Sequence, residues 1–277
     1  MKKLLSLLLV LSLALVGAAG CGDDAQPGGN DNTELTPVKV GASPTPHAEI
    51  LEVAQPLMAE KGYDLQIVEF TDYVLPNTAL ENGDIDANYF QHITYMNDFN
   101  EQNGTHLAAI AEIHYEPMGI YAGKTASLED LADGATVGVP ADTTNEARAL
   151  LLLEAAGLIT VDPEAGLTAT VYDITDNPKN LQISEIEAAQ LPRSLADLDI
   201  AVINANYALQ ADLSVTDDAL LAEAADSTAA QAYANVLTVR EGSEEDPALV
   251  ALAEVLKSDT VRQFIIDTYN NSVQPLF

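Results

Sequence analysis

Residues 84–96 read DIDANYFQHITYM, a short stretch in which three aromatic rings, a histidine and two amides follow an acidic turn. The whole chain has only five Phe, ten Tyr and no Trp, so this concentration of rings is unusual. The apolar residues at 85–90 predict a strand that runs into a helix. Rings alone are typical of a packed core, whereas rings mixed with amides and an imidazole favour a small-molecule pocket.

Around this stretch, short apolar runs alternate with helical patterns, which is typical of an α/β fold. We expect strands over 38–42, 64–70, 85–90, 107–115, 118–123, 136–140 and 233–241, and a strand that enters a helix over 198–208. We expect helices over 47–61, 144–158, 246–257 and 259–269. The sequence contains no repeat of fixed period.

The order of these elements predicts two lobes. The strand–helix order over 38–114 resembles the order over 136–210, and a further strand and two helices follow. Two α/β lobes, between which the chain crosses twice, explain this order. We therefore expect one lobe from 38–115 and 233–277 and the other from 116–232. In such a fold, strand ends and helix N-termini meet at a cleft in which a ligand binds.

The first twenty residues have the pattern of a secretory signal peptide: Lys2 and Lys3, an apolar run over 4–16, and then small residues. The apolar run is too short to span a bilayer. Cys21 is the single cysteine and follows small residues as in a bacterial lipobox, although the commonest motif has Leu where this chain has Ala18. We expect cleavage before Cys21, with diacylglycerol and palmitate added to it. The alternative is an ordinary secreted protein with a free thiol.

Residues 22–37 are rich in Gly, Pro, Asp and Asn and contain almost nothing to bury. With Cys21 they predict a lipidated, flexible tether over 21–37. We therefore expect a protein that is anchored by lipid to the extracytoplasmic face of the cell membrane.

The charge of the chain is strongly acidic, with 43 Asp and Glu against 11 Lys and Arg and a formal net charge of −32. Such a surface repels phosphate backbones and anionic headgroups, which argues against nucleic acid as a partner and against a polybasic membrane contact. A solvated acidic surface is a simpler explanation of this charge than an acid-specific function.

Motifs of catalysis are missing from the sequence. It has no C-x-x-C, no H-E-x-x-H, no G-x-S-x-G and no glycine-rich phosphate loop. The histidines show no ligand spacing such as i, i+4, at positions 47, 92, 106 and 114. We therefore predict that the protein is not an enzyme and that it has no metal site.

Four segments carry residues suited to holding a ligand: FTDYVLPN (70–77), NYFQHITY (88–95), PADTTNEARALLLL (140–153) and VINANYA (202–208). In the first, Asp72, Pro76 and Asn77 mark a turn that also carries Tyr73. In the third, Thr144 or Asn145 is expected to cap a helix that has Arg148 in its first turn. The helix dipole disfavours a cation there, so Arg148 needs an anionic partner.

Each of these residues also has a structural explanation. Core or rim packing explains Tyr73, Phe90 and Tyr95 taken one at a time. A lone histidine such as His92 is more often a hydrogen-bonded structural residue. Asn204 suits a helix cap, and a surface salt bridge would satisfy Arg148.

Taken together, the residues indicate one type of ligand. Arg148 with helix N–H groups can bind a carboxylate, and Asn204 can serve a carboxylate or an ammonium. An apolar sleeve with polar edges would be lined by Tyr73, Phe90, His92 and Tyr95. A zwitterion with an apolar tail fits this set, and a thioether would gain about 0.3–1.5 kcal/mol from sulfur–aromatic contacts.

The chain resembles the MetQ/NlpA family of lipid-anchored, methionine-binding proteins over residues 38–277. The resemblance lies in the segments FTDYVLPNTALENGDIDANYFQH, VPADTTNEARALLLL, DNPKNLQISEIEAAQLPRSLADLDIAVINANYA and YANVLTVRE. It implies a two-lobed periplasmic-binding-protein fold of type II with a ligand cleft between the lobes. It also implies a monomer that closes on L-methionine and delivers it to the permease and ATPase of an ABC importer, without catalysis and without a cofactor.

The resemblance implies ligand contacts from eight residues: Tyr73, Phe90, His92, Tyr95, Asn145, Arg148, Asn204 and Asn235. The four ring residues would hold the thioether side chain. Arg148, with Asn145 beside it, would bind the carboxylate, and Asn204 and Asn235 would hold the amino-acid head. Tyr207 matches a neighbouring position of the family without an assigned role.

Two residues depart from the pattern of the family. Tyr89 stands where relatives often have a smaller residue, and Glu116 lies next to the expected cleft. Glu116 would bind an ammonium or bias the site away from plain methionine. The alternatives are therefore another amino acid, D-methionine, a methionine derivative or a Met-containing dipeptide as ligand, or a surface lipoprotein without a transport role.

Overall fold

The computed structural model describes residues 35–224 and 232–277. The predicted signal peptide over 1–20, the lipidation site Cys21 and the tether as far as residue 34 lie outside the described residues. The first strand, β1 (Thr36–Ala42), begins two residues earlier than the sequence pattern predicts. Within the described part of the chain, no helix has the length and the apolar composition that a membrane crossing requires.

The described chain alternates strands and helices, as expected of an α/β protein. The remaining strands are β2 (Tyr63–Glu69), β3 (Ala87–His92), β4 (Leu107–Tyr115), β5 (Gly119–Ala122), β6 (Thr136–Pro140), β7 (Thr160–Val161), β8 (Ile174–Asp176), β9 (Gln182–Ile186), β10 (Ile200–Ile203), β11 (Ala219–Ala222), β12 (Ala234–Arg240) and β13 (Gln274–Pro275). The α-helices are α1 (Glu49–Glu60), α2 (Leu75–Asn82), α3 (Ile93–Asn103), α4 (Thr143–Ala155), α5 (Leu191–Ser194), α6 (Ala205–Gln210), α8 (Pro247–Leu256) and α9 (Asp259–Tyr269). A single helical turn, η1 (Pro44–Ala48), precedes α1.

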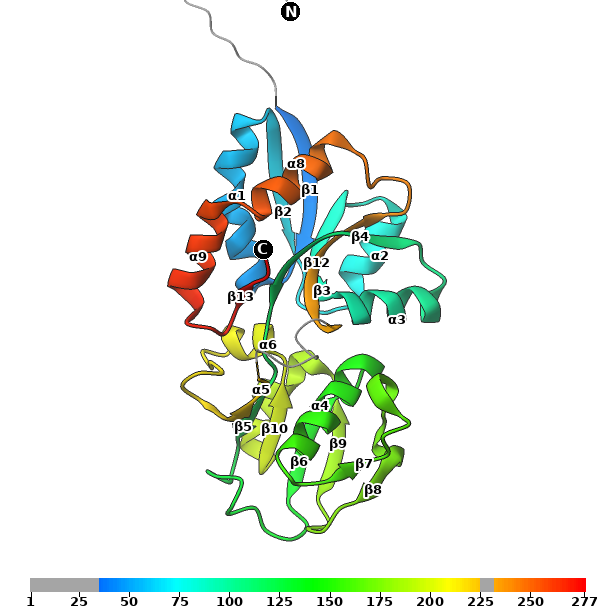
Figure 1. The fold of residues 1–277 in the computed structure, drawn as a ribbon, viewed down its shortest axis with the longest axis vertical. Coiled ribbons are helices and arrows are strands. Elements are labelled where there is room, and N and C mark those ends of the chain that lie inside the picture. Colours follow the sequence, from blue (N-terminus) through cyan, green and yellow to red (C-terminus); the bar gives the residue numbers. More distant parts are fainter. Residues whose placement is uncertain (1–34, 225–231) are drawn as a thin grey trace, which may run out of the picture. The chain divides into compact units, whose positions relative to one another are not determined.

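Two separate sheets form the centres of two lobes (Figure 1). Lobe 1 has the six-stranded sheet β13-β4-β12-β3-β1-β2, in which β1 lies parallel to β2 and β3 while β12 runs antiparallel to β3 and β4. Lobe 2 has the five-stranded sheet β11-β5-β10-β6-β9 and the small pair β7-β8. The prediction of a two-lobed α/β fold is confirmed.

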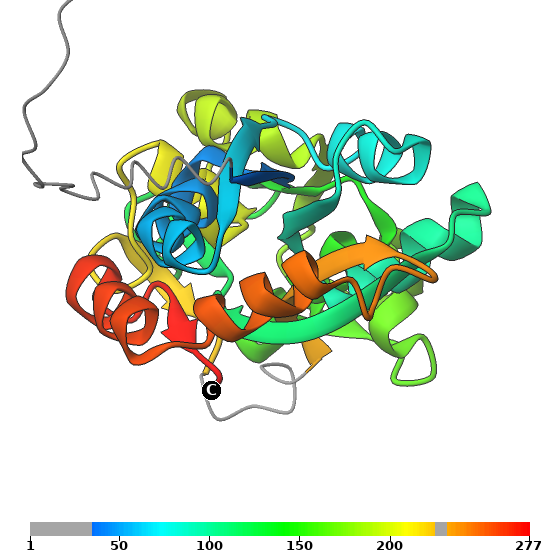
Figure 2. The same ribbon diagram turned by 90° about the horizontal axis from the view of Figure 1, so that it is seen from above.

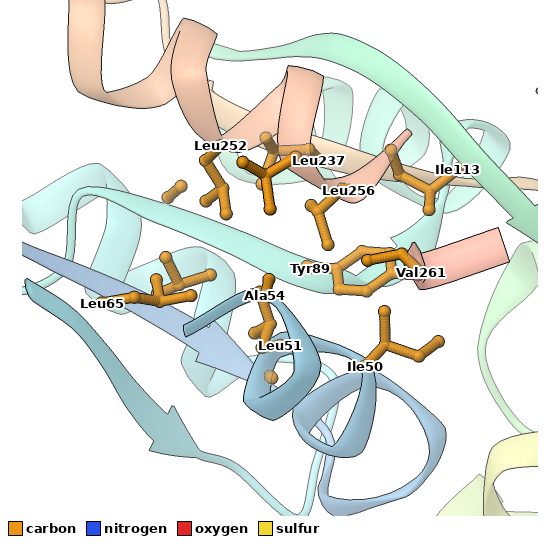
Figure 3. Packing of buried hydrophobic residues seen from close by; sticks show 14 of the residues in the cluster. Ile50, Leu51, Ala54, Leu65, Tyr89, Ile113, Leu237, Leu252, Leu256 and Val261 are labelled. Carbon is orange, nitrogen blue, oxygen red and sulfur yellow. The ribbon is translucent and has the colours of Figure 1, made fainter. Parts of the chain in front are cut away.

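Helices cover both faces of the sheet in lobe 1. On one face, α1 (blue) packs against both α9 (red) and α8 (orange) (Figure 2). The core beneath these helices joins Leu51 of α1, Tyr89 of β3, Leu237 of β12 and Leu256 of α8 (Figure 3). On the other face, α2 and α3 pack through a second apolar cluster that contains Phe90.

Lobe 2 is inserted between β4 and β12 of lobe 1. β4 ends at Tyr115, and β5 of the other sheet begins at Gly119. The apolar side of α4 packs on β6 and β10, with Leu150 and Leu153 fully buried among Val137 and Val202. The carboxyl ends of β3, β6 and β10 lead into α3, α4 and α6, so the starts of these helices carry the residues described next.

One local prediction for the stretch that carries Tyr73 was wrong. Pro76 and Asn77, predicted as part of a turn, lie in the first turn of α2. Proline is tolerated there because the first N–H groups of a helix have no partner within the helix. The turn predicted at Asp72 is present, since its carboxylate accepts hydrogen bonds from the N–H groups of Val74 and Leu75 at 2.8 Å each.

Candidate functional site

All eight residues that the sequence predicts as ligand contacts line one cavity between the lobes: Tyr73, Phe90, His92, Tyr95, Asn145, Arg148, Asn204 and Asn235. Lobe 1 supplies the four ring residues and Asn235, and lobe 2 supplies Asn145, Arg148 and Asn204. Four residues that were not among the predicted contacts complete the lining: Gln91, Glu116, Ala205 and Asn206.

The aromatic side chains form one continuous wall of this cavity. The ring centroid of Tyr73 lies 5.9 Å from that of Phe90, 5.6 Å from that of Tyr95 and 4.9 Å from that of Tyr207. Tyr207 belongs to lobe 2 and is not among the residues that line this cavity, but its ring packs against that of Tyr73 from the other lobe. Such rings offer an apolar surface with edges that suit sulfur and hydrocarbon chains.

A chain of hydrogen bonds links the lobes beside the wall. His92 caps α3, where its Nδ1 accepts from the N–H of Tyr95 at 3.0 Å. The proton of this imidazole is therefore on Nε2, which donates to Oδ1 of Asn145 at 3.1 Å. Nδ2 of Asn204 donates to the same oxygen at 2.7 Å. Burial, reinforced by the charge of Arg148, lowers the pKa of His92 to about 3, so its ring is neutral at pH 7.

The start of α4 differs from the prediction. The cap is Asp142, not Thr144 or Asn145, and its carboxylate accepts from the N–H of Asn145 at 3.1 Å and from Nδ2 of the same residue at 2.8 Å. Arg148 lies in the second turn of α4 and not in the first. The cap lies earlier than the sequence predicts because this helix start has four candidate residues in a row, all of types found at helix starts: Asp142, Thr143, Thr144 and Asn145.

In this structure the anionic partner of Arg148 is Glu223 of the protein itself, in a buried ion pair, where the sequence predicted a ligand carboxylate or a surface salt bridge. Nε donates to Oε1 of Glu223 at 2.7 Å and Nη2 to Oε2 at 2.5 Å, while Nη2 also donates to the carbonyl of Glu116 at 2.7 Å. The guanidinium lies 4.2 Å from the ring centroid of Tyr233. These bonds use Nε and Nη2 of Arg148, a residue that also lines the cavity. The sequence contained no signal that pairs positions 148 and 223.

Near the end of β4, the side chain of Glu116, which lines the cavity, meets those of His114 from β4 and His47 from η1. Glu116 Oε1 lies 2.7 Å from Nε2 of His114 and 3.3 Å from Nε2 of His47. Their potential ligand atoms all lie within 4.8 Å of one another, in a His₂Glu set of a kind that can bind zinc. His47 and His114 are distant in sequence, so no short ligand spacing in the sequence indicated this group. The absence of a metal site remains a prediction.

Two polar atoms in the lining have no hydrogen-bond partner among the described residues: Oδ1 of Asn204 and Nδ2 of Asn206. Both are buried, and leaving such a group unpaired costs about 1–3 kcal/mol. One is an acceptor and the other a donor, which is what the two ends of a zwitterion require. Asn206 could have been found in the segment NAN at 204–206, where it stands two residues beyond the predicted Asn204.

The free space at the centre of the cavity is about 20 Å³, measured as the volume open to the centre of a water molecule. This is room for about one water molecule. A ligand of amino-acid size therefore enters only when groups that now meet across the cavity move apart.

Two sheets in two α/β lobes, joined by chain crossings and enclosing a polar and aromatic cavity, define a protein of the periplasmic-binding-protein class. Residues 38–277 match the family model described as NlpA lipoprotein. The chain belongs to this family.

Three known proteins illustrate how close the similarity is. The methionine-binding lipoprotein MetQ of Bacillus subtilis is 38% identical over 281 aligned residues, which cover 100% of this chain and 99% of that protein. The D-methionine-binding lipoprotein MetQ of Escherichia coli is 40% identical, covering 95% and 93%. A nutrient binding protein from Burkholderia cenocepacia, solved bound to methionine, superposes with a TM-score of 0.83 at 42% identity and covers 87% of this chain and 100% of that one.

Proposed function

We propose that this protein captures L-methionine between its two lobes and delivers it to the membrane permease of an ABC importer. One observation carries the proposal: residues chosen from sequence as methionine contacts, from five separate segments, line a single cavity. The names of the relatives and the methionine-bound structure support the same ligand.

In this proposal each part of the cavity has its own role. The wall formed by Tyr73, Phe90 and Tyr95 holds the thioether chain, and His92 lies at its edge. Arg148 and Nδ2 of Asn206 bind the carboxylate. Buried donors of this kind strengthen a charged hydrogen bond because little water competes.

The proposal also covers the setting of the protein. The chain acts as a monomer without catalysis, is attached to the extracytoplasmic face of the cell membrane through lipidated Cys21, and closes by a hinge movement around its ligand. Lobe 1 consists of 38–115 and 233–277, and lobe 2 of 116–232. The NlpA lipoprotein family match supports a transport role and the lipid anchor.

Calorimetric titration of the mature protein tests the proposal. The protein is purified in detergent, stripped of bound solute by unfolding and refolding, and titrated with L-methionine, D-methionine, leucine and Gly-Met. We expect L-methionine to bind with a Kd of about 1 μM or lower, equivalent to about −8 kcal/mol, and leucine to bind far more weakly.

The same titration contains the results that contradict the proposal. If D-methionine or Gly-Met binds more tightly than L-methionine, that compound would be the ligand, and the proposed transport role would still stand. A folded protein that binds none of these compounds would contradict the methionine function. Circular dichroism before and after refolding serves as the control for the folded state.

A further inference from the structure

Gln91 lines the cavity although it was not among the predicted ligand contacts. It stands on β3 between Phe90 and His92, which both belong to those contacts. The amide of a glutamine carries two N–H donors and an oxygen that accepts, and each of them can bond a polar group of a ligand. The residue is only 3% exposed, so its bonds within the protein decide whether these groups are available in the cavity.

The donor and the acceptor of the Gln91 amide already have partners behind the cavity. Nδ2 of Asn77 donates to Oε1 of Gln91 at 2.8 Å, and Nε2 of Gln91 donates to Oδ1 of Asn77 at 2.7 Å, so the two amides form a reciprocal pair. Nε2 of Gln91 also lies 3.1 Å from Oδ1 of Asn88 and 3.3 Å from the hydroxyl oxygen of Thr238. Asn77, Asn88 and Thr238 are fully buried and are not among the described residues that line the cavity.

A backbone carbonyl fixes the direction of these amides. The carbonyl of Pro76 can only accept, so the group of Asn88 that meets it at 3.3 Å is Nδ2. The same Nδ2 lies 2.8 Å from Asn77, which must present Oδ1 to it. Nδ2 of Asn77 is then left for Gln91, whose oxygen faces it. Turning the amide of Gln91 over would set donor against donor and acceptor against acceptor.

The bonded amide of Gln91 limits what the cavity can offer to the side chain of a ligand. A tail that ends in an amide or a hydroxyl would lose its hydrogen bonds to water and would find no replacement at Gln91. A thioether or hydrocarbon tail has no such bonds to lose. The two lining atoms without a partner among the described residues, on Asn204 and Asn206, suit the two ends of a zwitterion instead.

We propose that Asn77, assisted by Asn88 and Thr238, is a positioning residue that determines specificity. By holding the amide of Gln91 away from the ligand, it keeps the thioether end of the cavity apolar and excludes amino acids with polar side chains. The hydroxyl of Thr238 also donates to Sδ of Met96 at 3.6 Å, so the network joins α2, α3, β3 and β12. This inference rests on the proposed function and adds how the site selects the side chain of methionine.

The test compares L-methionine with L-glutamine, whose side chain has about the same length and ends in an amide. Wild type, Asn77→Leu and Thr238→Val are titrated with both compounds by calorimetry. We expect wild type to prefer methionine by about 100-fold or more. Leucine is close to asparagine in shape, so Asn77→Leu mainly removes the reciprocal pair with Gln91. The preference should then fall by about tenfold, because methionine meets an unpaired amide and glutamine finds a partner. Thr238→Val removes one longer bond and should lower the preference by about threefold.

Asn100→Leu is the matched control in the same lobe. The amide of Asn100, in α3, is also bonded at both ends: it donates to the carbonyl of Leu107 at 2.8 Å and accepts from the N–H of Leu107 at 3.1 Å. Asn100 does not line the cavity, so Asn100→Leu should leave the preference for methionine unchanged. Urea unfolding of every variant verifies that folded protein is titrated.

Three results would overturn the inference. Equal losses of methionine and glutamine affinity in Asn77→Leu would show a structural role only. If Asn77→Leu does not fold, an unchanged preference in Thr238→Val decides against the inference. Wild type that binds glutamine within about tenfold of methionine would show that the bonded amide of Gln91 does not exclude polar side chains. Wild type that binds neither compound would instead contradict the proposed function.

Discussion

At the scale of single residues, the buried ion pair of Arg148 means that a substitution there should affect stability as well as ligand binding. The guanidinium and Glu223 are 4% and 8% exposed as side chains, so each depends on the other for compensation of its charge. Removing one partner of a buried pair leaves an uncompensated charge, which is more damaging than the loss of one contact. The burial of Arg148 therefore serves stability as well as ligand binding.

We predict that Arg148→Ala lowers the free energy of unfolding by about 3–5 kcal/mol and abolishes tight methionine binding. The double variant Arg148→Ala with Glu223→Gln should recover much of the stability, because no buried charge remains, but should not recover binding. Urea unfolding and calorimetry measure the two effects. Additive stability losses in the double variant would contradict the buried-pair interpretation.

A second prediction at this scale concerns the protonation of His92. Its pKa of about 3 in the folded protein lies below the unfolded value of 6.5, so the unfolded chain binds more protons between these values. The stabilising contribution of a neutral His92 is therefore complete above about pH 6.5 and is lost as the pH falls below it, at up to about 1.4 kcal/mol per pH unit.

His92→Asn isolates this effect, because asparagine keeps a side-chain cap for α3 and does not titrate. We expect the stability difference between wild type and His92→Asn to shift in favour of the variant by about 1.4 kcal/mol per unit as the pH is lowered from 6 to 4.5. Urea unfolding at several pH values measures this shift. A difference that stays constant with pH would show that His92 is not buried in its neutral form.

At the scale of elements, the start of α4 connects helix stability to the cavity. Asp142 caps the helix and also fixes the amide of Asn145, which in turn orients Asn204. Asp246 caps α8 in the same way, through the N–H of Ala248 at 2.8 Å, but α8 does not contribute to the cavity. The two caps therefore form a matched pair.

We predict that Asp142→Ala and Asp246→Ala each lower the free energy of unfolding by about 1 kcal/mol. Only Asp142→Ala should also weaken methionine binding, by about tenfold, because Asn145 and Asn204 lose their fixed orientation. Thermal unfolding and calorimetry are compared for the two variants. Equal methionine affinity in both would show that the cap has no influence on the site.

The helices and strands also differ in how well the sequence patterns predicted their positions. β4 and β6 occupy the predicted residues, since each is a clear apolar run between breakers. α2 was not predicted, because the residues LPNTALEN combine Pro and Asn with few apolar positions, and tertiary packing of Leu80 against Phe90 and Phe99 decides its helical state. Local patterns are weak where packing supplies most of the stability.

At the scale of the whole described body, residues 35–224 and 232–277, hydrogen bonds join the two lobes directly. Tyr73 of lobe 1 donates from its hydroxyl to Oδ1 of Asn206 of lobe 2 at 2.6 Å. With about 20 Å³ of free space in the cavity, binding and release of methionine require such contacts to break. The strength of the contacts between the lobes should therefore govern how long the ligand stays.

We predict that Tyr73→Phe increases the rate of methionine release by about two- to tenfold, because one hydrogen bond of about 0.5–1.5 kcal/mol between the lobes is lost while the ring remains. Tyr95→Phe is the control, since its hydroxyl donates to the carbonyl of Tyr73 at 3.2 Å within lobe 1. Stopped-flow competition with excess ligand measures both rates. Equal release rates for the two variants would argue against a role of the contact between lobes.

The sequence by itself determined the α/β class, the two-lobe plan and the residue types of a cavity for a zwitterion with an apolar tail. Periodicity, breakers and family-like segments are local properties, so they can be recognised without coordinates. Only the tertiary structure decided that Glu223 pairs with Arg148, that Asp142 rather than Asn145 caps α4, and that His47 and His114 meet at Glu116. These contacts join residues from separate elements, and their geometry and the direction of each hydrogen bond depend on how the elements pack, which no local pattern encodes.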